Sequence, residues 1–151
     1  MSDFRQVSQT FWASPQIDVA QVAEARQRGF AMVINNRPEG ETEDQVPGAA
    51  IEAAAGAAGM AYRAIPVTHA GFSEAQVREM AEALASADGP VLAYCRSGTR
   101  STLLWALAEA ARGASSDSIA EAAAGAGYDV ASIRPLIDML AARQGSASAG
   151  D

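Results

Sequence analysis

The chain has 151 residues, a formal net charge of −7 and a pI near 4.6, and its length fits one domain able to bury a core of its own. One cysteine excludes an internal disulfide and a multi-cysteine zinc site, and with a single histidine we expect neither a metal nor another cofactor. The acidic balance and the absence of lysine argue against nucleic acid or a membrane as partner, and without a signal segment or a long apolar run we expect a cytoplasmic protein.

Short apolar segments alternate with alanine-rich helical patterns, which indicates an α/β fold with a central, mostly parallel sheet flanked by helices. Two capping boxes, Asp18 with Gln21 and Ser73 with Gln76, mark helix starts. We expect, in order, one or two edge strands within 4–12, a helix over 18–28, a strand at 31–34, a helix over 47–58, a strand at 60–65, a helix over 73–87, a strand at 90–94, and helices over 102–111, 116–126 and 132–143. Residues 1–143 then form a single catalytic domain, and 144–151 a disordered tail.

Cys95 stands where the predicted strand at 90–94 meets a strongly helix-forming segment. The first N–H groups of a helix lack partners and the helix dipole is positive there, so anions bind at such ends. A thiolate is itself an anion, and this position therefore favours the reactive, deprotonated form of the side chain. We predict that Cys95 is a nucleophile rather than a small buried hydrophobe.

The segment that follows the cysteine has the composition of an anion-binding loop. Arg100 offers a planar fork of donors to an oxyanion, and Gly98 can take the positive φ that converging amides require. Ser101 can donate a hydrogen bond to the sulfur. We therefore predict catalytic roles for Cys95, Arg100 and Ser101, and substrate binding by Arg96, Ser97, Gly98 and Thr99.

A second candidate for anion binding lies in the loop after the strand at 31–34. Residues 35–47 are rich in turn formers, form a long connection, and leave the carboxyl end of that strand, where open α/β sheets place ligands. Because the body of the protein is acidic, a small anion must be attracted locally by arginines. We predict that Arg37 in this loop binds substrate alongside Arg96, and interpret Arg63 as a solvated surface charge.

The sequence CRSGTRS after PVLAY resembles the catalytic loops of two superfamilies with this architecture, the rhodanese sulfurtransferases and the cysteine-dependent phosphatases. Loop length separates them, because rhodaneses carry one residue fewer between cysteine and arginine than tyrosine and dual-specificity phosphatases. This chain has the shorter form. By contrast, the order of INNRP, YRAIPV, the helix from Ser73 and the loop is similar to that of a dual-specificity phosphatase.

A small bacterial family combines both traits, and the chain resembles it over about residues 4–140 through INNRPEGE, the IPVT segment and YCRSGTRS. This family is the phosphatase-like domain of beta-lactamase hydrolase-like proteins, also described as a sulfur transferase. The resemblance implies a three-layer fold like that of dual-specificity phosphatases. In the family the domain can be fused to a persulfide dioxygenase, which suggests a separate dioxygenase as a partner of this chain.

One departure from the dual-specificity phosphatases concerns the general acid. Those enzymes place an aspartate shortly after the strand that matches residues 62–67, and here Thr68 and His69 hold that place. An imidazole can protonate a leaving group near neutral pH, so we predict a catalytic role for His69. The missing aspartate weakens the phosphatase interpretation.

Three functions stay open, the first two with a small anionic sulfur or phosphate compound as substrate. Sulfur transfer ranks first: the Cys95 thiolate takes the outer sulfur of thiosulfate or a persulfide and hands it on, and because the departing group is a stable anion, no general acid is essential. The second is a phosphatase that forms a phosphocysteine, with Arg100 gripping the phosphoryl oxygens, Ser101 assisting the thiolate and His69 as acid. The third is a non-enzymatic anion-binding or thiol-sensing module.

Overall fold

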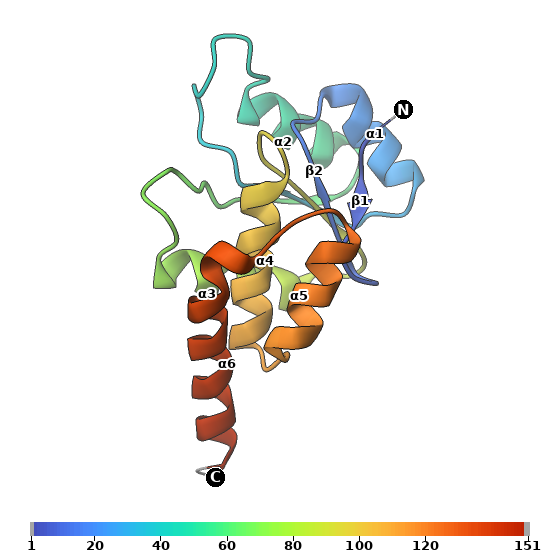
Figure 1. Ribbon diagram of the computed structural model, residues 1–151. Helices are drawn as coiled ribbons and strands as arrows, with labels where there is room; N and C mark the ends of the chain where they lie inside the picture. Colours follow the sequence, from blue (N-terminus) through green and yellow to red (C-terminus); the bar gives the residue numbers. More distant parts are fainter. Residues whose placement is uncertain (1, 150–151) are drawn as a thin grey trace.

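The computed structural model describes residues 2–149. Its sheet is built from five short strands, β1 (Arg5–Gln6), β2 (Phe11–Ser14), β3 (Met32–Asn35), β4 (Ala61–Ala64) and β5 (Val91–Tyr94). They lie in the order β1-β2-β5-β3-β4 (Figure 1). β1 runs antiparallel to β2, and the other three pairs are parallel, so the expected mostly parallel sheet is confirmed.

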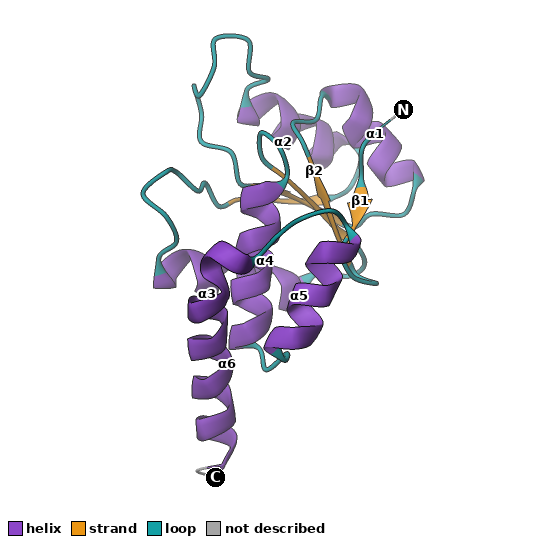
Figure 2. Cartoon of the chain, in the orientation of Figure 1, coloured by secondary structure: helices purple, strands orange, loops and turns teal. Residues whose placement is uncertain are grey.

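Helices cover both faces of this sheet (Figure 2). They are α1 (Val19–Gln27), α2 (Gly48–Ala57), α3 (Glu74–Ser86), α4 (Thr99–Ala111), α5 (Ser116–Gly125) and α6 (Arg134–Ala149), with a 3-10 turn at Ala131–Ile133. The predicted capping boxes open α1 and α3: Asp18 and Ser73 each accept a hydrogen bond from the main chain three residues on. No helix within residues 2–149 is long and apolar enough to cross a bilayer.

The strands divide their side chains between two cores, one on each face. In β3, Met32 and Ile34 join the core beneath α3 to α6, whereas Val33 packs with α1 and α2. β5 alternates in the same way, with Ala93 on the first face and Leu92 on the second. Because helices cover both faces, the central strands read as continuous apolar runs. The three-layer α/β fold that the resemblance implied is therefore confirmed.

The four parallel strands end at one line across the sheet. The last residues of β2, β5, β3 and β4 are register partners: Ser14 faces Tyr94, Tyr94 faces Asn35, and Asn35 faces Ala64. The loops that leave these ends must therefore meet at the same edge, where ligands bind in open α/β sheets. Figure 2 shows the long loops 36–47 and 65–73 at the end of the molecule where α4 begins.

The predicted position of one strand and the predicted ends of two helices need correction. β2 is not an edge strand but lies between β1 and β5, where Phe11 is fully buried and stacks on Trp105 at 5.6 Å between ring centroids. α4 begins at Thr99 rather than at residue 102, because Gly98 at a φ of 93° provides its N-cap. α6 continues to Ala149, through most of the segment expected to be a disordered tail, and residues 150–151 lie outside the described chain.

The last helix is part of the core rather than an appendage, and two residues of α6 test this. Ile137 has no exposed surface, whereas Met139 is 44% exposed. We expect Ile137→Ala to lower the free energy of unfolding by about 3 kcal/mol through a buried cavity, and Met139→Ala by about 0.5 kcal/mol or less. Urea unfolding of the two variants decides this, and equal losses would contradict it.

Candidate active site

Cys95 directly follows β5 and lies at the N-terminus of α4, where its side chain has no exposed surface. The Gly98 N–H donates to the Cys95 sulfur at 3.1 Å. On the helix side, the Thr102 hydroxyl donates to the Gly98 carbonyl at 2.9 Å and ties the loop to α4. The sulfur therefore accepts a main-chain hydrogen bond at the N-terminus of α4, where the helix dipole is positive.

Arg100 lies in the first turn of α4 and is held by three hydrogen bonds. Its Nη1 donates to Glu41 Oε2 and to the Val67 carbonyl, both at 2.7 Å, and its Nη2 donates to Glu41 Oε1 at 2.9 Å. The pKa of Arg100 is raised chiefly by the hydrogen bonds that it donates to Glu41, and the Cys95 sulfur contributes further. A guanidinium has five N–H groups, so Nε–H and one Nη2–H remain on a single edge, where they can grip an oxyanion.

Glu41 is the residue that orients this guanidinium, and Arg37 holds Glu41 in turn. Arg37 Nε donates to Glu41 Oε1 at 2.9 Å, while its Nη1 donates to Gln16 and its Nη2 to Thr42. Hydrogen bonds from Arg100 first and from Arg37 next lower the pKa of Glu41 to about 2. The carboxylate is therefore ionised at neutral pH and neutralises part of the charge of two arginines.

Arg37 itself is 5% exposed and lies outside the hollow beside Arg100. The sequence predicted that it binds substrate, because a loop arginine on an acidic protein is a natural anion ligand. In the structure Arg37 instead holds Glu41 by a hydrogen bond, and its side chain is buried.

A hollow of about 390 Å³ opens beside Arg100. It is lined by residues of three loops and of the first turn of α4, namely Pro38, Glu39, Gly40, Glu41, Thr68, His69, Arg96 and Arg100. Two predicted site residues, His69 and Arg96, are exposed here. Ser97, on the loop, and Thr99, the first residue of α4, are both exposed, and the Ser97 hydroxyl donates to the Thr99 hydroxyl at 3.0 Å. The structure thus brings His69 into one hollow with Arg96 and Arg100 of the loop that follows Cys95, whereas Cys95 itself is buried and does not line the hollow.

Ser101 does not make the hydrogen bond to sulfur that its position suggests. Its hydroxyl is fully buried and has no partner among the described residues. The main-chain N–H of Gly98 bonds to the sulfur instead. A contribution of Ser101 to the chemistry stays a prediction that requires its hydroxyl to turn toward the sulfur.

Sequence reasoning missed Glu41 and the Val67 carbonyl. Loop 35–47 was expected at the site, but an acidic residue in a turn-rich segment is indistinguishable from a solvated charge until its partner is known. That partner, Arg100, lies 59 positions further along the chain. The contact at Val67 is made by its main-chain carbonyl, which every residue has, so no residue type could have indicated it.

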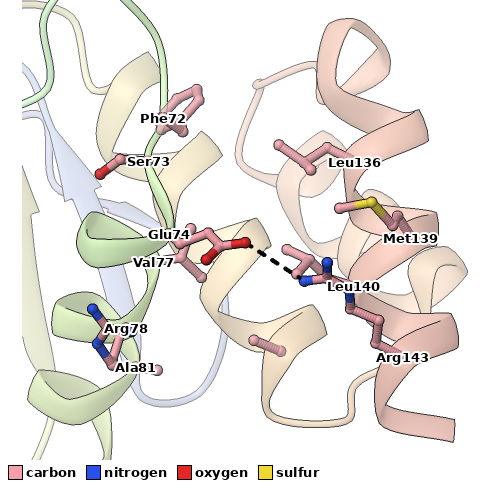
Figure 3. Close-up of a pocket in the computed structure, with 11 residues that line it drawn as sticks. Phe72, Ser73, Glu74, Val77, Arg78, Ala81, Leu136, Met139, Leu140 and Arg143 are labelled. Carbon is pink, nitrogen blue, oxygen red and sulfur yellow. Dashed lines mark ion pairs between the residues drawn. The ribbon is translucent and has the colours of Figure 1, made fainter. Parts of the chain in front are cut away.

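A second hollow, of about 380 Å³, lies away from this chemistry, between α3 and α6 (Figure 3). Its walls are mostly apolar, with Phe72, Val77 and Leu140 among them, and the ion pair of Glu74 with Arg143, at 3.9 Å, lies across it. Apolar walls suit packing rather than anion chemistry, so the candidate active site is the hollow beside Arg100. Among residues 2–149, no three His, Cys, Asp or Glu side chains gather as metal ligands do.

The sequence model of the family named beta-lactamase hydrolase-like protein, phosphatase-like domain, matches residues 3–112, which include the loop from Cys95 to Arg100. The chain belongs to this family. A beta-lactamase hydrolase-like protein of Agrobacterium fabrum is 44% identical over 86 residues, which are 57% of this chain and 20% of that protein. The match thus spans about a fifth of the length of this relative.

Two solved structures extend the likeness to almost the whole chain. A protein of Neisseria meningitidis, described as a candidate phosphatase, is 32% identical and covers 93% of this chain and 99% of its own, with a TM-score of 0.80. PTPMT1 is 14% identical, covers 98% of this chain and 99% of its own, and has a TM-score of 0.75, which shows a common fold.

These likenesses overturn the ranking that placed sulfur transfer first. The family is phosphatase-like and the Neisseria protein is described as a candidate phosphatase, so the rhodanese interpretation is wrong. Loop length misled because the shorter spacing between cysteine and arginine was taken as the mark of a rhodanese. In the structure the shorter loop still brings Arg100 to the Cys95 sulfur, which contributes to the raised pKa of the guanidinium.

The free energy of unfolding at acidic pH tests whether Glu41 is ionised and held by the two arginines in the folded protein. Because its pKa in the folded state is about 2, below the usual 4.5, the carboxylate stabilises the fold above about pH 4.5, and that stabilisation is lost as the pH falls toward 2. The full effect is about 3 kcal/mol. We expect the free energy of unfolding of the parent to fall over this range and that of Glu41→Gln to fall less. Glu43→Gln is the control, because Glu43 is exposed on the same loop, and its unfolding free energy should change with pH as that of the parent does. If the unfolding free energy of Glu41→Gln also fell with pH as much as that of the parent, the assignment would be contradicted.

Proposed function

We propose that the protein is a cysteine-dependent phosphatase that works through a phosphocysteine intermediate. The observation that carries the proposal is the free edge of the Arg100 guanidinium beside a sulfur that faces the N-terminus of α4. Three donors of Arg100 are already engaged by Glu41 and Val67, so the remaining two are held in one direction. Fixed donors at the position of developing charge are the main source of rate acceleration in phosphoryl transfer.

In the proposed reaction the Cys95 thiolate attacks phosphorus while the bond from phosphorus to the ester oxygen breaks. The ester oxygen leaves with the bonding electron pair and takes a proton, for which His69 in the wall of the hollow is our candidate donor. Water then attacks the phosphocysteine, releasing inorganic phosphate and the thiolate. The main-chain N–H groups of Arg96 and Ser97 and the free edge of Arg100 hold the equatorial oxygens in both steps, because those of Gly98 and Thr99 already donate to the Cys95 sulfur and the Ser97 hydroxyl.

The walls of the hollow suit a polar substrate. Six of its eight lining residues carry polar or charged side chains, namely Glu39, Glu41, Thr68, His69, Arg96 and Arg100. PTPMT1, which shares the fold, has been solved in complex with PI(5)P, a phosphate ester of a polyol. We therefore propose a small, polar phosphate monoester as substrate.

Two substitutions test the proposed chemistry directly. We expect Cys95→Ser to abolish turnover of a phosphate monoester, and Arg100→Lys to lower kcat/KM at least tenfold, about 1.4 kcal/mol, because an ammonium keeps the charge but loses the planar fork. Arg112→Lys, at the far end of α4 and paired with Glu109 at the surface, is the matched control and should keep parental kinetics.

The intermediate itself can be trapped. Acid quenching during turnover should add the mass of one phosphoryl group to the parent protein and none to Cys95→Ser. Turnover by Cys95→Ser, or an unmodified parent under burst conditions, would rule out the phosphocysteine route.

The role of His69 is tested by varying the leaving group. A general acid matters most for a poor leaving group, because a good one departs without a proton. We expect His69→Asn to lower kcat for an alkyl phosphate tenfold or more and to leave kcat for a nitrophenyl phosphate within about threefold of the parent. An equal loss on both substrates would assign His69 to binding rather than to proton transfer.

A further inference from the structure

Tyr128 lies directly beneath the catalytic loop, although it comes from a distant part of the chain. It stands between α5 and the 3-10 turn at Ala131–Ile133, beyond the residues 3–112 that match the family. Its side chain is buried, and its hydroxyl donates to the Ser97 carbonyl at 3.4 Å. The ring also touches Gly98 so closely that a Cβ added there would collide with the hydroxyl and lie 3.0 Å from Cζ.

The hydrogen bond from Tyr128 falls on the peptide unit that matters most to the nucleophile. The Ser97 carbonyl and the Gly98 N–H belong to one peptide, and in a trans peptide these two groups point in opposite directions. Tyr128 holds the carbonyl on one side, and the N–H on the other donates to the Cys95 sulfur at 3.1 Å. A hydrogen bond to the carbonyl fixes the plane of the peptide and polarises its N–H, which strengthens the second bond.

The surroundings of Tyr128 keep it in this position and keep its proton in place. The guanidinium of Arg5, at the start of the sheet, lies over the ring at 5.3 Å from its centroid. Burial, the largest contribution, raises the pKa of the phenol, so the hydroxyl remains a donor at neutral pH. Gly98 has no side chain and a φ of 93°, which allows the ring to approach the loop backbone.

We propose that Tyr128 is a positioning residue of the active site: its hydroxyl orients the peptide between Ser97 and Gly98 so that the Gly98 N–H stabilises the Cys95 thiolate. The inference rests on the proposed role of Cys95 as nucleophile and adds a residue to that site. The same N–H stabilises the sulfur when it departs from the phosphocysteine, so Tyr128 acts on both steps through the loop and touches no substrate.

The test compares Tyr128→Phe, which keeps the ring and loses the hydroxyl, with Tyr128→Leu, which loses both. The readouts are the rate of Cys95 alkylation by iodoacetamide at pH 7 and the kinetics of phosphate monoester hydrolysis. We expect both variants to be alkylated at least threefold more slowly than the parent, with kcat reduced by a similar factor and KM within twofold. The control is Tyr62→Phe. Tyr62 lies on the edge strand β4, where its hydroxyl accepts a hydrogen bond from Asn35, and this variant should be alkylated and turn over like the parent.

Each outcome is decisive. Parental alkylation by Tyr128→Phe together with slow alkylation by Tyr128→Leu would mean that the ring only packs, and would overturn the proposal. Tyr128→Phe decides the matter even if Tyr128→Leu does not fold, because it preserves the shape of the core. Alkylation needs no turnover, so slow alkylation of Tyr128→Phe in a protein that hydrolyses no phosphate ester would support the positioning role while refuting the phosphatase.

Discussion

The site depends on one carboxylate shared by two arginines. Glu41 accepts from Arg37 and Arg100 at 2.9 Å each through the same oxygen, and from Arg100 again through the other. This arrangement fixes a guanidinium next to the Cys95 sulfur, our proposed nucleophile, and it fastens loop 36–47 to the start of α4. The three charges are largely removed from solvent, so salt screens them less than it screens surface pairs.

What the sequence predicted well is local. The apolar run ending at Tyr94, the cysteine, Gly98 and a helix former in succession specify a strand, a tight turn and a helix, because each residue favours the conformation that its neighbours need. The capping boxes at Asp18 and Ser73 are equally local and were placed correctly. The layered α/β fold follows from the alternation of such segments along the chain.

The sequence could not predict which residues from distant segments of the chain contact one another. Nothing local distinguishes Glu41 from Glu43, yet one is bound to two arginines and the other is exposed. The same holds for Tyr128, whose contact with the loop depends on how α5 packs against α4. Arg37 was predicted to bind substrate, but its guanidinium points to Glu41 and Gln16, two partners that its own segment does not reveal.

The two edge strands of the sheet affect whether the protein pairs with other copies of itself in concentrated solution. At one edge β1 has two residues, both exposed, and at the other β4 is short, with Arg63 exposed on it. Long, flat and apolar edges recruit strands from other molecules, whereas short and charged ones resist such pairing. A site built at the carboxyl ends of parallel strands can thus remain open to small molecules while the sheet itself is closed to strand exchange with neighbouring chains.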